Sequence, residues 1–342
     1  MTDLAANMAQ LARDACGTQT AKLGLALQRL LQEPDVEAVH DVRVACRRLR
    51  VVLRITKKLF GAGRVEGIRG RLKELLVLLG GTRDAEVLAA RAQRLADSGD
   101  RGAAELLAIL GSRTEEQRRA TARRGERSVL TALPQQIERL ISRRPAQSKR
   151  ALKRLATPVA QRAERVLAKR MRILWRFAGL DGASPAKEQH KLRIEMKKLR
   201  YAAEFFAQGP VPRRAEKVGS GAVPEPTPGH AAEHPLEGII KIAEGYQELL
   251  GNLHDAVVAE ETLTQWQREG LPWDTPAARR KTPAAGAASH PVFPLRSLLE
   301  SARRDESSLR REFGARWGPK QLRKLERAVK AMGRDHGARP AG

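Results

Sequence analysis

The sequence predicts an all-α fold: two internally repeated helical bundles with a pseudo-twofold relation, which would allow two basic helices to face one another across a shared groove. Apolar residues recur at spacings of three and four along nearly all of the chain, whereas the alternation typical of β-strands is absent. Ala, Leu, Arg and Glu dominate, and these residues favour helices. Segments of the first half also recur in the second half in the same order, which indicates an internal duplication. The chain has 342 residues, of which 42% are hydrophobic, so it can bury a large core.

The predicted helices form two sets, one in each half of the chain. The first set covers roughly 4–32, 36–60, 64–80, 83–97, 101–127 and 129–143. The second set covers roughly 150–178, 186–207, 237–251, 254–269, 295–313 and 319–332. Two stretches rich in Gly and Pro, 209–235 and 269–294, predict loops in the second half. We therefore expect a first repeat at 1–145 and a second at 146–342, which together form one domain at about 4–330.

The helix predicted at 36–60 combines an apolar face with a basic stripe. Val42, Cys46 and Leu49 recur at spacings of four and three, as in a helix that packs one face on a core. At about 100° per residue, one stripe of cationic side chains runs beside that face: His40, Arg43, Arg47, Arg50 and Arg54. Arg48 lies further round the helix, and the one nearby acid, Asp41, lies off the stripe. Like charges at such spacings repel by roughly 0.2–0.5 kcal/mol per pair. The stripe is therefore either a solvated face or a surface that binds an anion.

The stripe occurs a second time. The segment HKLRIEMKKLR, from His190, repeats HDVRVACRRLR, from His40. The repeated cationic positions are His190, Arg193, Lys197, Lys198 and Arg200. Glu204 stands where the first copy has Arg54. A random basic surface would not repeat this pattern, so we interpret both stripes as one anion-binding surface whose halves face each other across the groove.

Two further pairs of segments extend the repeat. AKLGLALQRL at 21–30 resembles AKRMRILWRF at 168–177, which adds four cationic candidates: Lys22, Arg29, Lys169 and Arg176. LLGGTRDAEV at 78–87 resembles LLGNLHDAVV at 249–258. The offsets of the three repeated pairs are 147, 150 and 171, and the larger last offset coincides with the inserted stretch 209–235.

The last repeated pair predicts a helix boundary in each half. Gly80 and Gly251 suit the left-handed position after a helix, and Gly81 and Asn252 can cap the helix that follows. The carboxylates then fall at the third helical position, where they meet free N–H groups: Asp84 and Asp255. An additional interpretation is that each carboxylate pairs with an arginine of the stripe and orients it. Arg83 and His254 lie beside these positions and could add to an anion site.

Composition restricts the partner class. The formal net charge is +25 and the isoelectric point is near 11.0, which favours nucleic acid, an anionic membrane or a phosphate polymer. Aromatic residues make up only 4%, which argues against a single-strand binder that stacks bases. Cys16 and Cys46 are expected to be buried thiols in a reducing compartment. No signal-peptide pattern and no run of 18 apolar residues occurs, so we expect a cytoplasmic protein without a membrane partner.

The sequence predicts no metal, no cofactor and no catalytic residue. His40 and His190 lack His, Cys or acidic partners at metal-ligand spacing, and neither has a recognisable orienting acid. Both fit better as hydrogen-bond donors at the end of an anion-binding stripe. No Walker, dinucleotide-binding or zinc motif occurs. His230 and His234, in the first Gly/Pro-rich stretch, are expected to be solvated.

The doubled pattern H-x-x-R-[VI]-x-x-[RK]-[RK]-L-R, with an LG-x-x-[RH]-D after each copy, resembles the CHAD domain, the conserved histidine α-helical domain. The resemblance implies two four-helix bundles with a basic central surface, and binding of inorganic polyphosphate at polyphosphate granules. It assigns binding to the motif residues of both stripes, with Lys197 and Lys198 in place of arginine. Some family members carry a CYTH triphosphatase domain with an E-x-E-x-K motif, which this sequence lacks.

The leading hypothesis is therefore a non-enzymatic protein that binds inorganic polyphosphate through a His-, Arg- and Lys-lined groove at granules in the cytoplasm. One alternative is a general nucleic-acid-binding protein, because the net charge attracts any polyanion. Less favoured is an enzyme that cuts or extends polyphosphate with His40 or His190. A granule scaffold that recruits partners through its Pro-rich loops would be compatible with polyphosphate binding. The sequence does not determine the oligomeric state.

Overall fold

The structure is a computed structural model, and it describes residues 2–80, 83–126, 129–143, 157–209, 234–270 and 295–334. Within these ranges every regular element is a helix and no strand occurs, which confirms the all-α prediction. The helices are α1 Thr2–Gln32, α2 Val36–Phe60, α3 Ala62–Leu78, α4 Arg83–Asp97, α5 Arg101–Glu126, η1 Val129–Ala132, α6 Leu133–Ile141, α8 Val159–Leu174, η2 Trp175–Phe177, α9 Ala186–Ala207, α10 Glu237–Glu269, α12 Leu295–Arg316 and α13 Pro319–Arg334. Residues 210–233 and 271–294, where two loops are predicted, lie outside the described residues.

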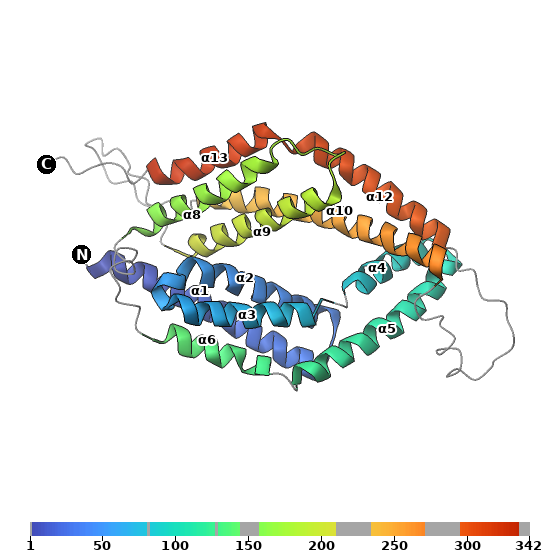
Figure 1. The fold of residues 1–342 in the computed structure, drawn as a ribbon, viewed down its shortest axis with the longest axis horizontal. Helices are drawn as coiled ribbons and strands as arrows, with labels where there is room; N and C mark the ends of the chain where they lie inside the picture. Colours follow the sequence, from blue (N-terminus) through green and yellow to red (C-terminus); the bar gives the residue numbers. More distant parts are fainter. Residues whose placement is uncertain are drawn as a thin grey trace, which may run out of the picture.

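The main hydrophobic core contains the helices that carry the two stripes. It joins apolar residues of α1, α2, α3 and α6 to apolar residues of α8, α9, α10 and α13. Leu49 and Leu53 of α2 and Met196 and Leu199 of α9 are fully buried in it. α2 and α9 lie side by side at the centre of the molecule (Figure 1). Because each helix packs its apolar face on its own neighbours, the basic stripes of both helices remain beside their shared boundary.

A second, smaller core lies at the end of the molecule where α4, α5 and α12 meet (right side of Figure 1). It joins α4 and α5 to α12 and the C-terminal part of α10, through residues such as Leu88, Leu106, Leu263 and Leu298. Arg91 of α4 crosses this region and is only 4% exposed. Its Nη1 donates to Asp305 Oδ2 at 2.8 Å and to Ser301 Oγ at 3.0 Å, both on α12. Both cores thus contain residues from either side of position 145. The division at that position and the pseudo-twofold symmetry remain predictions.

The predicted helix boundary at Gly251 and Asn252 is wrong. Both residues lie inside α10, a single helix of 33 residues, so Asn252 caps no helix and Asp255 lies mid-helix rather than at a helix start. The apolar face of α10 continues through this point, with Leu250, Leu253 and Ala256 all buried. A glycine inside a helix costs only about 1 kcal/mol relative to alanine, and burial on both sides of Gly251 outweighs that cost.

The corresponding helix end predicted at Gly80 is confirmed in position, but the backbone conformation predicted for Gly80 is wrong. α3 ends at Leu78, and the Gly80 N–H donates to the Val77 carbonyl at 3.0 Å. Gly80 does not adopt the left-handed conformation that we predicted for it. The described chain resumes with α4 at Arg83, whereas Gly81 and the side chain of Asp84 lie outside the described residues. The predicted caps there are therefore untested.

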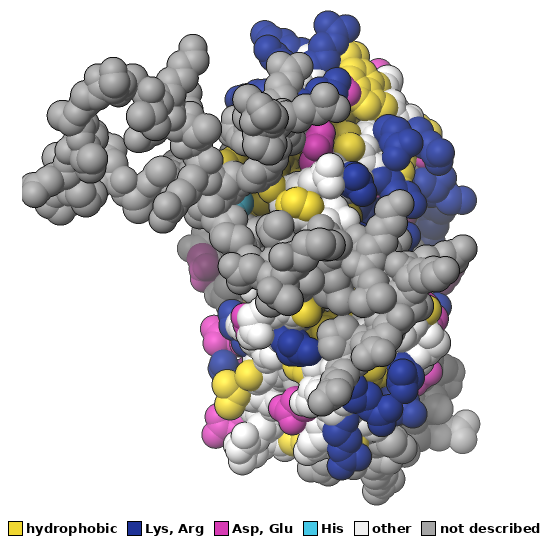
Figure 2. Space-filling model, turned by 90° about the vertical axis from the view of Figure 1, so that its left-hand side faces the viewer, with side chains coloured by type: hydrophobic (Ala, Val, Ile, Leu, Met, Phe, Trp, Pro, Cys, Tyr) yellow, Lys and Arg dark blue, Asp and Glu magenta, His cyan; other side chains and the backbone are white. Residues whose placement is uncertain are grey.

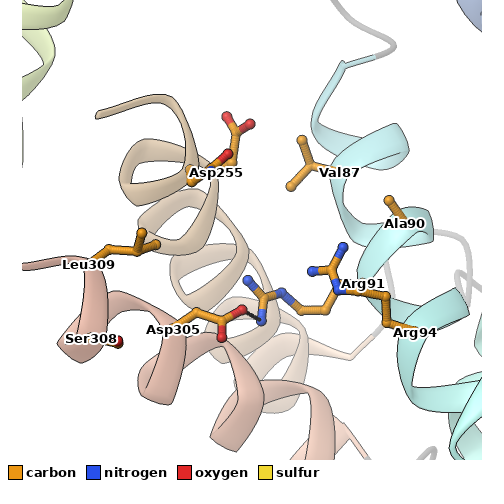
Figure 3. A pocket seen from close by; sticks show the side chains of 9 residues that line it. Val87, Ala90, Arg91, Arg94, Asp255, Asp305, Ser308 and Leu309 are labelled. Atoms are coloured by element: carbon orange, nitrogen blue, oxygen red, sulfur yellow. Dashed lines mark hydrogen bonds and ion pairs between the residues drawn. The ribbon is translucent and has the colours of Figure 1, made fainter. Parts of the chain in front are cut away.

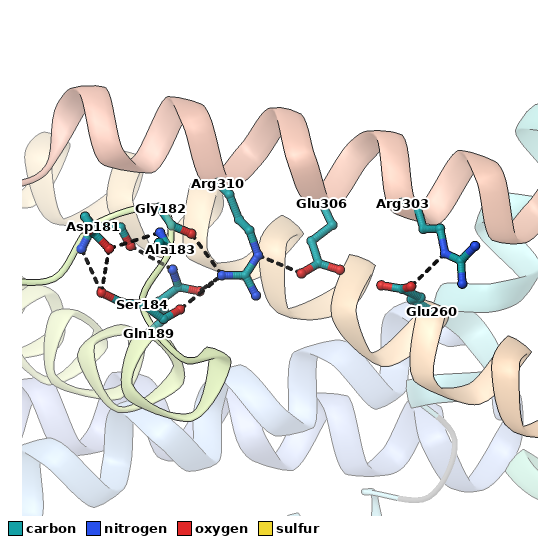
Figure 4. A network of polar contacts seen from close by, with 9 residues as sticks. All are labelled: Asp181, Gly182, Ala183, Ser184, Gln189, Glu260, Arg303, Glu306 and Arg310. Atoms are coloured by element: carbon teal, nitrogen blue, oxygen red, sulfur yellow. Dashed lines mark hydrogen bonds and ion pairs between the residues drawn. The ribbon is translucent and has the colours of Figure 1, made fainter.

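The start of α9 is fastened to α12 by a network of polar contacts (Figure 4). Arg310 Nη1 donates to the carbonyls of Gly182 and Ser184, each at 3.0 Å, and its Nε donates to Glu306 Oε1 at 2.6 Å. A Cβ at Gly182 would lie 2.4 Å from the Arg310 carbonyl oxygen, so only glycine permits this approach. Gln189 adds a bond from its Nε2 to the Asp181 carbonyl at 3.1 Å. These contacts fix the position of the next residue, His190, which begins the second stripe.

Candidate functional site

Two hollows meet between α2 and α9 and form one central groove. The first has a volume of about 410 Å³ and the second about 450 Å³. Arg47 of α2 and Arg193, Lys197 and Tyr201 of α9 line both. We name them the cationic hollow and the mixed hollow because the charges of their other lining residues differ.

The cationic hollow collects basic side chains from five helices. Its basic lining residues are Arg43, Arg47, Arg50 and Arg54 of α2, Arg69 of α3, Arg170 of α8, His190, Arg193, Lys197 and Lys198 of α9, and His254 of α10. The remaining lining is apolar or aromatic: Val51, Leu76, Ile194 and Tyr201. In the part of the chain that the structure describes, no Asp or Glu lines this hollow. Cations at such density repel one another unless an anion enters.

The mixed hollow contains the remaining motif residues together with acids. Its basic lining residues beyond the shared ones are His40, Arg48 and Arg200. Its acidic lining residues are Glu244, Glu248 and Asp255, all on α10. All motif residues of both stripes, and Arg54, therefore line one hollow or the other. Their roles in binding remain a prediction.

The four cationic candidates outside the motif occupy different places. Lys22 and Arg29 line a separate hollow of about 460 Å³, which shares Val44 and Arg48 with the mixed hollow. Arg29 already pairs with Asp35 and with Glu37, the latter at 3.1 Å. The other two candidates are exposed and do not line the groove: Lys169 of α8 and Arg176 of η2.

Sequence reasoning missed two arginines of the cationic hollow, Arg69 and Arg170. At about 100° per residue, Arg170 lies beside the buried face formed by Leu167 and Met171, whereas Lys169 lies nearly opposite that face. Arg69 flanks the buried face of α3 in the same way. The position of Arg69 and Arg170 beside the buried faces of their helices could have identified them as groove residues. The alignment of the repeated segments indicates Lys169 instead.

Two of the predicted arginines are held in place by specific contacts, one with a backbone carbonyl and one with a glycine. Arg43 Nη1 donates to the Leu79 carbonyl at 3.2 Å, at the C-terminal end of α3, where the helix dipole favours a cation. Arg193 is only 7% exposed, and its guanidinium lies against Gly251. A Cβ on Gly251 would lie 3.1 Å from Arg193 Nη2. The glycine that we predicted as a helix end therefore provides space for an arginine of the groove.

Carboxylates partner some groove cations and not others. Glu204 accepts from Arg200 Nε at 2.7 Å and pairs with Arg48 Nε at 3.1 Å. Glu195 pairs with Arg170 at 3.4 Å and with Lys198. In contrast, Arg50 and Arg54 have no carboxylate within ion-pair distance among the described residues. Burial, followed by the neighbouring Arg69, lowers the pKa of Arg50, and burial with the neighbouring Arg54 lowers the pKa of Arg170.

The two motif histidines have different surroundings. His40 is exposed at the rim of the mixed hollow. The His190 ring lies 4.5 Å from that of His254, and its buried Nδ1 has no hydrogen-bond partner among the described residues. Burial, then Arg193 and Lys197, lower the pKa of His190 below its ordinary value. A bound anion would reverse the effect of these two cations.

No metal centre and no reactive thiol emerges from the described residues. They contain no group of three or more His, Cys, Asp or Glu side chains placed to hold a metal ion. The arginines around His190 would also repel a metal cation. Cys16 and Cys46 are buried, as predicted, and burial raises the pKa of each thiol to about 12.

Asp255 lies where the mixed hollow meets a further hollow of about 490 Å³ between α4, α10 and α12. Val87, Arg91 and Arg94 of α4 line the same hollow, and the Arg91 guanidinium points toward Asp305 of α12 (Figure 3). The predicted pairing of Asp255 with an arginine of the stripe remains untested. The partner position in the first repeat, Asp84, has no described side chain.

Basic side chains also occur away from the groove. The end of the molecule at the left of Figure 1 carries separate groups of Lys and Arg, with acidic and apolar side chains between them (Figure 2). Net charge alone therefore does not single out the groove, whereas the acid-free lining of the cationic hollow does. Among the described helices, none is both long enough and apolar enough to span a bilayer.

Comparison with known proteins identifies relatives by family and by fold. The family model described as the CHAD domain matches residues 15–264. The crystal structure of the CHAD domain from the plant Ricinus communis is similar, with a TM-score of 0.56 and 19% identity over 94% of this chain and 91% of that one. PptA from Streptomyces chartreusis is also similar, with a TM-score of 0.54 and 18% identity over 94% of this chain and 99% of that one. No curated protein matches the sequence.

Proposed function

Since the chain belongs to the CHAD domain family, which is known for its association with polyphosphate, we propose that it binds inorganic polyphosphate in the central groove without chemical change. The acid-free cationic hollow is the observation that carries this proposal. A phosphate polymer has a negative charge on every unit and no bases to be read. Its binding therefore requires repeated cationic contacts rather than hydrogen bonds to particular bases.

The groove residues suit this ligand in distinct ways. Arg50 and Arg54 have no described carboxylate partner, so their guanidinium groups can grip phosphate oxygens in pairs. Lys197 and Lys198 add point charges that follow a flexible polymer. His190 can donate once a phosphate offsets its cationic neighbours. Binding releases counterions, so affinity should fall steeply as salt rises.

Nucleic acid is the second candidate partner, favoured by the net charge of +25 and by the basic groups outside the groove. A DNA duplex is too large to enter a hollow of about 410 Å³, whereas a single polyphosphate chain is thin enough to enter it. Duplex DNA would therefore contact the outer basic groups and compete poorly for the groove. Competition between the two polyanions discriminates these functions.

A polyphosphate-processing enzyme is less well supported. His190 lies among Arg193, Lys197 and His254 rather than beside a carboxylate that could orient it for proton transfer. Chain-length analysis of polyphosphate after incubation with the protein tests this alternative. An unchanged length distribution is expected, and shortened or extended chains would contradict the non-catalytic proposal.

The decisive experiment is a titration of labelled long-chain polyphosphate at about 0.15 M salt, with duplex DNA as competitor. We compare the wild type with Arg50→Gln/Arg54→Gln, which disrupts no ion pair among the described residues. The matched control is Arg165→Gln/Arg172→Gln, which removes the same charge from exposed positions of α8. Loss of two charge-assisted contacts should weaken binding about a hundredfold in the groove variant.

Equal losses in the groove variant and the control, or displacement of polyphosphate by an equal phosphate concentration of DNA, would show that binding is general electrostatic attraction. We also propose that the protein is cytoplasmic and associates with polyphosphate granules. A fluorescent fusion should coincide with a polyphosphate stain, and the groove variant should not.

A further inference from the structure

Glu204 pairs with two arginines that line the mixed hollow, although it lines neither hollow of the groove itself. Its side chain is only 19% exposed, and it lies on α9 facing α2. It holds Arg200 through an Nε–Oε1 contact of 2.7 Å within α9 and Arg48 through an Nε–Oε2 contact of 3.1 Å across the α2–α9 boundary. Arg200 has a second carboxylate at 2.8 Å, that of Glu244. The cations at this end of the groove already have protein counter-charges.

The opposite end of the groove is different. In the aligned repeats, position 204 of α9 corresponds to position 54 of α2, where an arginine stands. Arg50 and Arg54 line the cationic hollow, without a carboxylate within ion-pair distance in the described part of the chain. Arg48 and Arg200 line the mixed hollow instead. The exchange of an acid for an arginine between the repeats, together with the three acids of α10, thus makes the two ends of the groove unlike in charge.

A carboxylate in this position opposes a bound polyanion in two ways. It occupies guanidinium N–H groups that would otherwise donate to phosphate, and it repels any phosphate that approaches them. Both effects are strong here because the carboxylate and both guanidinium groups are largely buried and therefore weakly screened. The three acids of α10 in the mixed hollow act in the same direction.

We propose that Glu204 determines the extent of the polyphosphate site: it withholds Arg48 and Arg200 from the ligand, so the bound segment ends near Arg47 and Tyr201, which divide the two hollows. This inference rests on the proposed function. The cationic hollow holds the tightly bound phosphates, and a longer chain gains little from the mixed hollow. Removing the charge of Glu204 should therefore extend the site.

The test compares Glu204→Gln with Glu188→Gln. Both variants lie on α9 and lose one negative charge, but Glu188 pairs with the exposed Lys191 and does not line the groove. Tripolyphosphate and long-chain polyphosphate are titrated over a range of salt concentrations. Glu204→Gln should bind long chains about tenfold tighter, with a salt slope steeper by about one, because at least one more phosphate is contacted. Tripolyphosphate, which fits within the cationic hollow, should bind each protein within about twofold.

A double variant, Glu204→Gln/Arg48→Gln, removes the ion pair as a unit and leaves no buried arginine without its carboxylate. It should lose the gain in affinity, because Arg48 is gone and Glu244 still pairs with Arg200. Thermal unfolding of each variant verifies that the helices remain folded. If Glu204→Gln does not fold, tighter long-chain binding by the double variant than by the wild type would overturn the proposal.

The titration separates failure of this inference from failure of the proposed function. If the wild type binds long chains but Glu204→Gln behaves like Glu188→Gln, Glu204 does not limit the site. An equal gain for tripolyphosphate and long chains would also overturn the proposal, since it would reflect a general increase in positive potential. If the wild type does not bind polyphosphate at all, both proposals fail.

Discussion

Replacing Gly251 with alanine should lower the affinity for polyphosphate while it leaves the free energy of unfolding nearly unchanged. Within a helix, this change alone favours the folded state by about 1 kcal/mol, because alanine loses less backbone freedom than glycine. The new Cβ, however, would lie 3.1 Å from Nη2, 3.5 Å from Nε and 3.6 Å from Cζ of Arg193. A comfortable carbon contact needs about 3.5–4.0 Å, so the guanidinium must move by several tenths of an ångström.

Arg193 can make that movement only at a cost, since it is 93% buried between α9 and α10 (7% exposed). The strain should offset most of the gain in helix propensity and leave the unfolding free energy of Gly251→Ala within about 0.5 kcal/mol of the wild type. Affinity for polyphosphate should fall about fivefold, because positioning of charge-assisted donors is sensitive to such shifts. Stability and affinity would then respond differently to one methyl group.

Gly245→Ala is the matched control on the same helix. Its Cβ would meet Arg316 Nη2 at 3.5 Å, an ordinary contact, and it does not line the groove. It should gain about 1 kcal/mol in the free energy of unfolding and bind polyphosphate like the wild type. Urea unfolding and polyphosphate titration measure the two quantities. A Gly251→Ala protein with the full gain in stability and unchanged binding would refute the role of Gly251 as the seat of Arg193.

Two further predictions concern charge. The pKa of His190 is lowered in the free chain by burial, Arg193 and Lys197, and a bound polyanion raises it again, so binding takes up a proton. Affinity should therefore rise as pH falls through the pKa of the complex; titrations between about pH 8 and 6 should show a slope that His190→Gln flattens. Without ligand the sign is opposite: the depressed pKa contributes stability above the unfolded-state value of about 6.5, which is lost as pH falls, and thermal unfolding measures this loss. Arg91→Ala should lower the free energy of unfolding by about 2–3 kcal/mol, because it removes a buried link between α4 and α12, whereas Arg94→Ala, on the same helix but without a described ion pair, should cost under about 0.5 kcal/mol.

The helices of the groove could be predicted closely from sequence because their apolar and basic residues repeat with clear helical periodicity. The bounds expected for α2 and α9 are those observed, and the sequence pairing of His40 with His190 placed both stripes on one groove. The repeat also located Glu204 as the exception to the pattern. What periodicity determines well is the face that a residue occupies on its own helix.

The contacts between helices could not be predicted from the periodicity of the sequence. Gly251 was interpreted as a helix end because glycine commonly follows a helix, but here it meets the guanidinium of Arg193 from another helix. Arg69 and Arg170 were missed because neither belongs to the repeated motif, although both flank buried faces. The role of Gly251 and the location of these two arginines depend on which helices pack together, and the periodicity of a single helix does not determine its neighbours.

The distribution of acids in the groove indicates how the chain balances stability against binding. A hollow that brings the half-buried Arg50 close to Arg69 stores repulsion, because burial strengthens interactions between charges. Carboxylates beside every cation would remove that repulsion, but they would also compete with a phosphate ligand. The chain instead places Glu195 and Glu204 beside some of the groove cations and leaves Arg50 and Arg54 without a carboxylate among the described residues. The paired cations lower the cost of folding, while Arg50 and Arg54 retain donors for the proposed ligand. The large core around α2 and α9 then supplies the stability that such uncompensated arginines take away, and under the proposed function a bound polyanion would return it.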